Sequence, residues 1–92
     1  MRLSDVSENK TVVISKLLGH GSFRRRISEM GFVAGKEVTV MKNAPFRDPV
    51  EYRVMGYNVS LRRAEANLIE VVTPEEAGSL VAHGFDGTID ME

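Results

Sequence analysis

The chain of 92 residues contains no cysteine and no tryptophan, and its longest apolar runs are only a few residues long. Without cysteine it can form neither a disulfide framework nor a thiolate metal site. A transmembrane helix requires roughly 20 apolar residues, and a signal peptide requires an apolar stretch of about 7–15 residues. Neither is present, so the composition predicts one small cytoplasmic domain with a single core and no direct membrane insertion.

The usual signatures of catalysis and of metal binding are missing as well. The sequence has no cysteine nucleophile, no G-x-x-x-x-G-K-[ST] element and no H-E-x-x-H motif. A metal site built from imidazoles would require a cluster such as two histidines and a carboxylate. The two histidines, His20 and His83, are far apart in the sequence, and nothing in the pattern brings them together. We therefore predict no enzymatic activity, no catalytic or metal-binding residues and no cofactor.

Charge is distributed unevenly along a chain whose net charge is only −1. All twelve lysines and arginines lie in residues 1–72 beside eight acidic residues, which leaves that segment at +4. Residues 73–92 contain five acidic residues and no basic ones. A mildly basic body with an acidic tail is not typical of a dedicated nucleic-acid-binding protein.

Five segments have the composition of short β-strands. Some alternate apolar and polar residues with the period of a half-buried strand, and others are rich in β-branched residues. Their ranges are 11–18, 37–42, 50–55, 57–62 and 68–72. Gly56 and Tyr57 fit the loop of a type II′ hairpin, which needs glycine at its first central position. That hairpin would place Glu51 opposite Arg62, where the two charges would pair.

A short helix is expected after the first strand. Ser22 can cap it, because its hydroxyl can accept hydrogen bonds from free N–H groups of the first turn. Phe23, Ile27 and Met30 then form one apolar stripe that faces the core. Gly31 follows at the position where helices commonly adopt a left-handed residue.

Two further helical segments complete the expected fold. Residues 60–66 form a single turn between two strands, which lets the chain change direction as small β-barrels require. Thr73-Pro74-Glu75-Glu76 is a strong helix start that leads towards His83. The fold class is therefore mainly β: a five-stranded barrel with a short helix after the first strand, a one-turn helix before the fifth and a C-terminal helix.

These motifs are similar to those of the FeoA domain of bacterial ferrous iron transport systems. The matching segments are 26–32, 35–38, 44–45, 48–50 and 56–66. The resemblance covers about residues 1–72 and implies an SH3-like barrel, with residues 73–92 as a C-terminal helix and acidic tail or linker. It marks as structural motif residues Arg26, Glu29, Met30, Gly31, Leu61, Arg62 and Glu65.

The resemblance also implies a partner and a location. A FeoA-like domain is expected to be a non-enzymatic accessory domain acting on FeoB, a membrane permease with a cytosolic GTPase domain, either in trans or fused in cis. This chain would then work in the cytoplasm, at the inner face of the cell membrane through its partner. The domain itself is expected to bind no iron.

Four residues are candidates for binding that partner. Arg24 and Arg25 are expected in the first turn of their helix, where the helix dipole disfavours cations. Either a partner surface or a solvated charged face would explain them. Met55 and Tyr57 lie at the expected hairpin tip and, together with Phe46, could form an apolar docking patch.

The alternative class is a nucleic-acid-binding small barrel, or the C-terminal SH3-like domain of a metal-dependent transcriptional repressor. Binding to single-stranded nucleic acid would call for aromatic platforms beside basic residues. The chain has six aromatic residues, and Phe23, Phe32 and Tyr52 are expected in the core. We therefore predict no nucleic-acid partner. Weak association of the chain with a second copy of itself is a further expectation.

Overall fold

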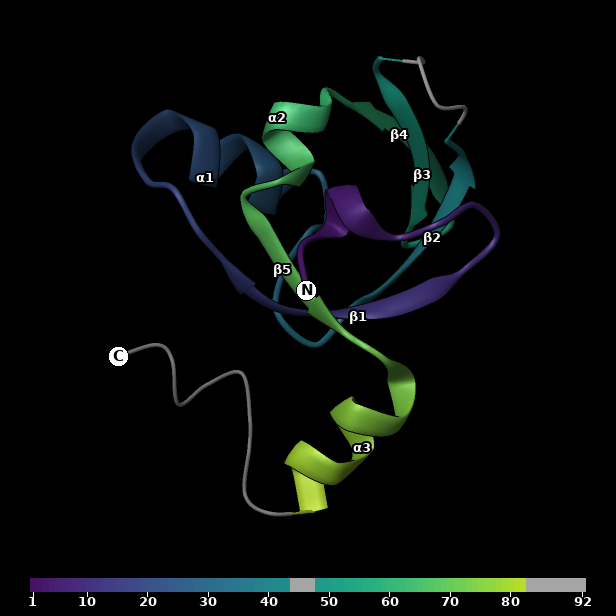
Figure 1. The fold of residues 1–92 in the computed structure, drawn as a ribbon. Coiled ribbons are helices and arrows are strands. Elements are labelled where there is room, and N and C mark those ends of the chain that lie inside the picture. Colours follow the sequence, from purple (N-terminus) through teal and green to yellow (C-terminus); the bar gives the residue numbers. More distant parts are fainter. Residues whose placement is uncertain (44–47, 83–92) are drawn as a thin grey trace.

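The computed structural model describes residues 1–43 and 48–82, and shows a five-stranded antiparallel sheet curled into a small barrel (Figure 1). The strand order across the sheet is β4-β3-β2-β1-β5. The described elements, in chain order, are the 3-10 turn η1 (Leu3–Asp5), β1 (Thr11–Leu17), α1 (Gly21–Glu29), β2 (Glu37–Lys42), β3 (Val50–Val54), β4 (Tyr57–Leu61), α2 (Arg63–Ala66), β5 (Ile69–Val72) and α3 (Pro74–Ala82). The fold class predicted from the sequence is confirmed.

The core consists of apolar side chains that the strands, α1 and the N-terminal turn direct into the barrel. The alternating residues of β2 and β3 behave as their pattern predicts, since every second side chain is buried. No charged side chain is buried among the described residues. The buried residues are Leu3, Val6, Val12, Ile14, Leu17, Ile27, Phe32, Val38, Val40, Val50, Tyr52, Val54, Leu61, Ala66, Ile69 and Val71.

In the hairpin between β3 and β4, the loop lies one residue earlier than predicted, and the strand pairing is shifted by two residues. Its two loop residues are Met55 and Gly56, with φ of 50° and 82°, as in a type I′ turn. Glu51 therefore lies opposite Ser60, and the predicted pairing of Glu51 with Arg62 is wrong. A shift of two residues keeps the same side chains facing inward, which is why the alternation alone could not detect it.

The start of α1 also differs from the prediction. The helix begins at Gly21, with His20 as its capping residue and no side-chain hydrogen bond to the free N–H groups, so Ser22 lies inside the helix and is not its cap. Gly19 and Gly21 have φ of +81° and +68° on either side of His20. The chain therefore turns into the helix through backbone conformations that glycine adopts readily.

The helix α3 begins as predicted, and its start is stabilised by a reciprocal capping box. The backbone N–H of Glu76 donates to Thr73 Oγ1 at 3.1 Å, and the backbone N–H of Thr73 donates to Glu76 Oε1 at 2.9 Å. The helix packs beside β1 and β5, away from α1 and α2 (Figure 1). The expected helix end near His83 lies outside the described residues, as does Phe46.

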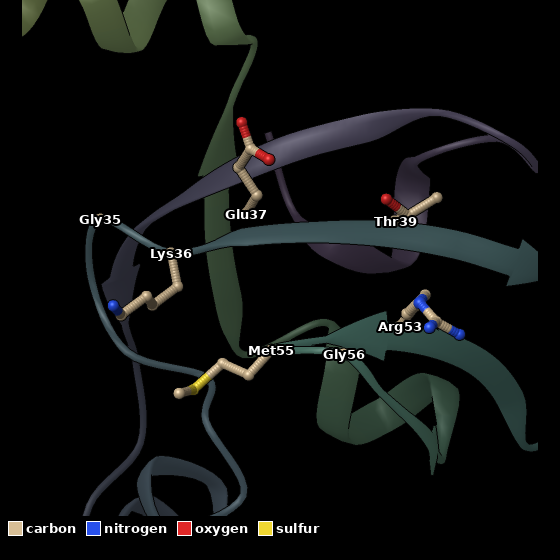
Figure 2. A pocket seen from close by; sticks show the side chains of 7 residues that line it. All are labelled: Gly35, Lys36, Glu37, Thr39, Arg53, Met55 and Gly56. Carbon is tan, nitrogen blue, oxygen red and sulfur yellow. The ribbon is translucent and has the colours of Figure 1, made fainter.

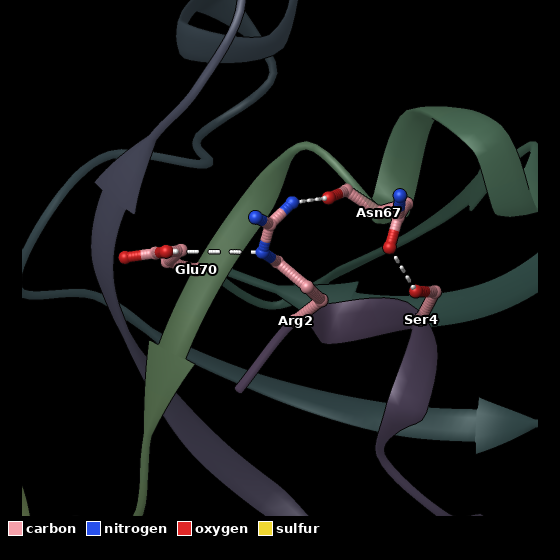
Figure 3. A network of polar contacts seen from close by, with 4 residues as sticks. All are labelled: Arg2, Ser4, Asn67 and Glu70. Carbon is pink, nitrogen blue, oxygen red and sulfur yellow. Dashed lines mark hydrogen bonds and ion pairs between the residues drawn. The ribbon is translucent and has the colours of Figure 1, made fainter.

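The N-terminus is tied to β5 by a polar network that the sequence did not predict (Figure 3). One guanidinium nitrogen of Arg2 donates to the carbonyl oxygen of Asn67 at 2.6 Å, and its Nε lies 3.7 Å from Glu70 Oε2. Ser4 Oγ donates to Asn67 Oδ1 at 3.2 Å. These contacts hold η1 against α2 and β5, where Leu3 is fully buried.

Candidate docking surface

A shallow apolar groove lies between the C-terminal end of α1 and the start of β4. Its volume is about 350 Å³. The lining residues are Glu29, Met30, Gly31, Met55, Tyr57 and Val59. The groove thus contains Met55 and Tyr57, two of the four predicted partner-binding residues. It also contains Glu29, Met30 and Gly31, which the family resemblance marked as structural motif residues.

Tyr57 and Val59 are not fully buried although they lie on the inward face of the sheet. They pair with Val54 and Tyr52, whose side chains are buried, and adjacent paired residues of a sheet point to the same face. Nevertheless 73% of Tyr57 is exposed and Val59 is only half-buried. The apolar face of the barrel is therefore left open at the beginning of β4.

The loop residue Met55 packs across the end of α1. It is 59% exposed, and its sulfur would lie 3.0 Å from a Cβ atom placed on Gly31. Gly31 has φ of +105°, a conformation that side chains rarely adopt. Glycine at this position therefore allows both the turn at the helix end and the close approach of the hairpin loop.

Arg24 and Arg25 are exposed on α1 but do not line the groove. Within residues 1–43 and 48–82 neither makes an ion pair or a side-chain hydrogen bond. Because α1 begins at Gly21, Arg24 lies at the end of the first helical turn, and the expected position in that turn is wrong for Arg25. The helix dipole falls off within the first turn, so the role proposed for the two residues rests on exposure and charge.

The end of α1 is fixed by an ion pair between two residues of the structural motif. Arg26 donates to Glu65 Oε2 at 2.5 Å, and the backbone N–H of Arg62 donates to Glu65 Oε1 at 2.9 Å. The hydrogen bond from Arg62 and, secondarily, the contact with Arg26 hold the pKa of the Glu65 carboxyl below its usual value. Glu65 thus caps α2 and joins it to α1. No local pattern predicts the contact between Glu65 and Arg26, because 39 positions separate the two residues.

The other motif residues occupy different environments. Leu61 is buried in the core and Met30 is half-buried against it. Arg62 is exposed at the start of α2, where its backbone N–H donates to Glu65 Oε1. Glu29 is exposed on the rim of the groove, and its carboxylate has no hydrogen bond or ion pair with another described residue.

A second depression lies on the outer surface of β2 and β3, on the other side of Met55 (Figure 2). Its volume is about 440 Å³. Lys36, Glu37 and Arg53 line it, so charges of both signs are present and no single sign dominates. Arg53 is also engaged in the hairpin, where its guanidinium donates to Asn58 Oδ1 at 3.1 Å. The polar lining makes this depression a poorer docking site for an apolar side chain than the groove.

Other chemistry is scarce in the part of the chain that the structure describes. No group of three or more His, Cys, Asp or Glu side chains gathers there as a metal site would require. Burial raises the pKa of the Tyr52 hydroxyl to about 12, so this phenol stays protonated at neutral pH. Among the described residues no helix is long and apolar enough to span a membrane.

Comparisons with known proteins agree with the resemblance. The family model described as the FeoA domain matches residues 1–73. A fusion protein of Porphyromonas gingivalis, named as Fe(2+) transport protein A and Fe(2+) transporter FeoB, is 58% identical over 71 residues. The match covers 77% of this chain and 8% of that protein.

Solved structures give the same result for the fold. The solution structure of iron(II) transport protein A from Clostridium thermocellum has a TM-score of 0.76 and 33% identity, covering 82% of this chain and 46% of that one. The FeoA of Stenotrophomonas maltophilia, described as a prokaryotic SH3 domain protein in complex with zinc, has a TM-score of 0.70 and 28% identity. It covers 77% of this chain and 88% of that chain. The barrel is therefore SH3-like.

Proposed function

Because the chain belongs to the FeoA domain family, we propose that it is a non-enzymatic accessory domain of a ferrous iron uptake system that docks on the cytosolic GTPase portion of FeoB. The family is that of a small accessory domain and is not a known enzyme family. Fusion of a 58% identical FeoA domain to FeoB in one relative supports FeoB as the partner, in cis or in trans. The domain would act at the inner face of the membrane, held there by its partner. Residues 1–72 would form the docking barrel, and residues 73–92 a helix and linker.

The observation that carries this proposal is the open apolar groove beside β4. Large exposed apolar side chains at adjoining positions are typical of interaction sites, whereas single exposed ones are common on any surface. Met55 and Tyr57 are two of the three large apolar side chains that the described surface exposes most, and they line one groove. Arg24 and Arg25 add positive charge on the neighbouring helix, which would speed association with an acidic surface.

Docking would regulate transport through differential binding. A bound domain can shift its partner between two conformations only if it binds one of them more tightly. The walls of the groove are a helix end held by Arg26 and Glu65 and a strand paired to β3, and such walls would give the groove a fixed shape. It would therefore select the FeoB state whose surface fits it.

The direct test titrates the 92-residue chain against the isolated GTPase domain of its cognate FeoB and, separately, against a generic DNA duplex, at low and moderate salt. We expect saturable binding to the GTPase domain. The double variant Met55→Ser/Tyr57→Ser should weaken it by more than about tenfold, because buried aromatic anchors dominate interface energies. Arg24→Glu/Arg25→Glu should weaken it mainly at low salt, because salt screens exposed charges.

The matched control for the arginine variant is Lys10→Glu/Lys42→Glu, which makes the same change in net charge at exposed positions outside α1 and the groove. Absence of GTPase binding, together with tight duplex binding that falls steeply with salt, would replace the proposal with the nucleic-acid alternative. Sedimentation of the chain alone checks the expectation of weak self-association.

A further inference from the structure

The strand β4 forms one edge of the sheet and pairs only with β3 among the described strands. Because the hairpin has a two-residue loop, its closing pair Val54–Tyr57 is hydrogen-bonded, and the bonded pairs recur at every second residue. Tyr57, Val59 and Leu61 therefore direct their backbone groups to β3. Asn58 and Ser60 direct their N–H and C=O groups away from it.

Those outward backbone groups have no partner in the part of the chain that the structure describes. No backbone–backbone hydrogen bond outside the ladder involves residues 57–61, and Asn58 and Ser60 are both exposed. Natural sheet edges are commonly protected by a lysine, a proline, a bulge or a covering segment. The segment Tyr57–Leu61 contains no charge and no proline, and its pairing with β3 is regular. As far as residues 1–43 and 48–82 are concerned, this edge is therefore open to another strand.

The apolar groove runs beside the same strand. Tyr57 and Val59 are two residues apart on one face of β4, so their side chains repeat at the spacing of about 7 Å that a second extended chain would have. Met30 and Gly31, at the end of α1, line the groove as well. An extended segment lying between the helix end and the strand edge could pair with β4 while its alternate side chains enter the groove.

The charge of the groove limits which segment would fit. Among the described residues, Glu29 is the only charged one in the lining, and it has no ion-pair partner among them. A basic side chain on the incoming segment would provide that partner. An acidic side chain at the same position would be repelled.

We infer that the groove takes an extended segment of the cytosolic portion of FeoB, which pairs with the free edge of β4, places apolar side chains at alternate positions against Met55, Tyr57 and Val59, and sets one basic side chain against Glu29. The inference rests on the proposed function and specifies how the docking occurs. Strand addition obtains its affinity from backbone hydrogen bonds and its specificity from the alternate side chains.

The first experiment measures amide hydrogen exchange in the 92-residue chain, with and without saturating FeoB cytosolic domain. Bound FeoB should slow exchange at the amides of Asn58 and Ser60 by at least about tenfold, because these N–H groups acquire acceptors. The amides of Thr11 and Thr39 on the far strands should not change. This measurement needs no substitution in the chain.

The second experiment compares Ser60→Pro with Ser60→Ala. Proline removes the outward N–H without removing a bond to β3, and proline is tolerated at such edge positions. Alanine keeps the N–H and removes only the hydroxyl. We expect Ser60→Pro to weaken binding about tenfold, Ser60→Ala to bind like the native chain, and both to melt within a few degrees of it. Glu29→Lys should weaken binding more than Glu29→Gln.

The outcomes separate this inference from the proposed function. If FeoB binds but exchange at Asn58 and Ser60 is unchanged, and Ser60→Pro binds like Ser60→Ala, the strand-pairing mode is refuted and the docking proposal stands. If FeoB does not bind at all, both are refuted. If the chain protects the same amides on its own at high concentration, the edge belongs to a second copy and the assignment to FeoB is wrong.

Discussion

Replacing the half-buried Glu65 by alanine should destabilise the barrel more than replacing the exposed Glu29, which lines the groove. The carboxylate accepts two hydrogen bonds, one from the backbone of Arg62 and one from the guanidinium of Arg26. Loss of a helix cap costs typically about 1 kcal/mol. The ion pair is worth about 0.5 kcal/mol, because the Arg26 side chain is 52% exposed and solvent screens it.

Together these contributions amount to about 1.5 kcal/mol. For a domain of this size, such a loss should lower the melting temperature by about 6–12 °C. Glu65→Gln should cost only about 0.5 kcal/mol, since the amide oxygen can still accept from the Arg62 N–H while the ion pair is lost. Arg26→Gln should cost about the same, for the same reason.

The pH dependence provides an independent check of this assignment. The pKa of Glu65 is lower in the folded chain than its ordinary value of 4.5, so the folded state favours the charged carboxylate. Its contribution is therefore complete above about pH 4.5 and disappears as the pH falls through the folded pKa. The difference in unfolding free energy between the native chain and Glu65→Ala should be constant from pH 7 to 5 and should shrink below that.

Chemical denaturation at pH 7, 5 and 3.5 measures both quantities. The matched control is Glu29→Ala, because Glu29 is an exposed glutamate at the end of α1 without a described partner, and such changes usually stay within about 0.5 kcal/mol. The reasoning would be refuted if Glu65→Ala were no more damaging than Glu29→Ala. It would also fail if the difference from the native chain persisted unchanged at pH 3.5.

Three further predictions concern single residues. Gly31→Ala should lower the free energy of unfolding by at least about 1 kcal/mol, because Gly31 has a φ of +105° and the added Cβ would lie 3.0 Å from the Met55 sulfur. Gly35→Ala should cost less, because Gly35 has open space around it. Equal losses of stability in urea denaturation would contradict the contact with Met55. Alkaline titration of the tyrosine absorbance should show an ionisation near pH 12 that Tyr52→Phe removes, because burial opposes the phenolate; its persistence in the variant would disprove the assignment. Thr73→Ala should increase amide exchange at Ala77, whose N–H donates to the Thr73 carbonyl, while changing the melting temperature by less than about 3 °C; an unchanged exchange rate would show that the capping box is dispensable.

The sequence predicted the strands and α3 well because these elements depend on local patterns. Alternation identifies the inward residues of β3, and the box formed by Thr73 and Glu76 identifies the start of α3. The hairpin was misplaced because Met55 adopts a positive φ, which nothing in a methionine signals. The helix start was misplaced because glycine conformations, rather than a capping side chain, begin α1.

The candidate docking groove was predictable only in part, because it is formed by side chains that the rest of the barrel leaves uncovered. The exposure of Met55 and Tyr57 was expected at a hairpin tip, although the two loop residues are Met55 and Gly56 and Tyr57 lies outside the loop. Its pairing with buried Val54 would ordinarily place it in the core. Whether an inward-facing residue is covered depends on the position of α1, which is set by a contact 39 positions apart in the sequence. Local patterns contain no information on such a contact.

The motif residues and the proposed docking residues therefore differ in function: the first position the walls of the groove, and the second would contact the partner. Arg26 and Glu65 fix the end of α1, and Gly31 lets Met55 cross it. Replacing any of these three residues would weaken docking even if the residue does not contact the partner. The reason is that the groove would keep its width only while the end of α1 is held in place. A loss of binding in Glu65→Ala would thus report positioning, whereas a loss in Tyr57→Ser or Ser60→Pro at unchanged stability would report contact. Comparing melting temperature with affinity across these variants separates the two tasks.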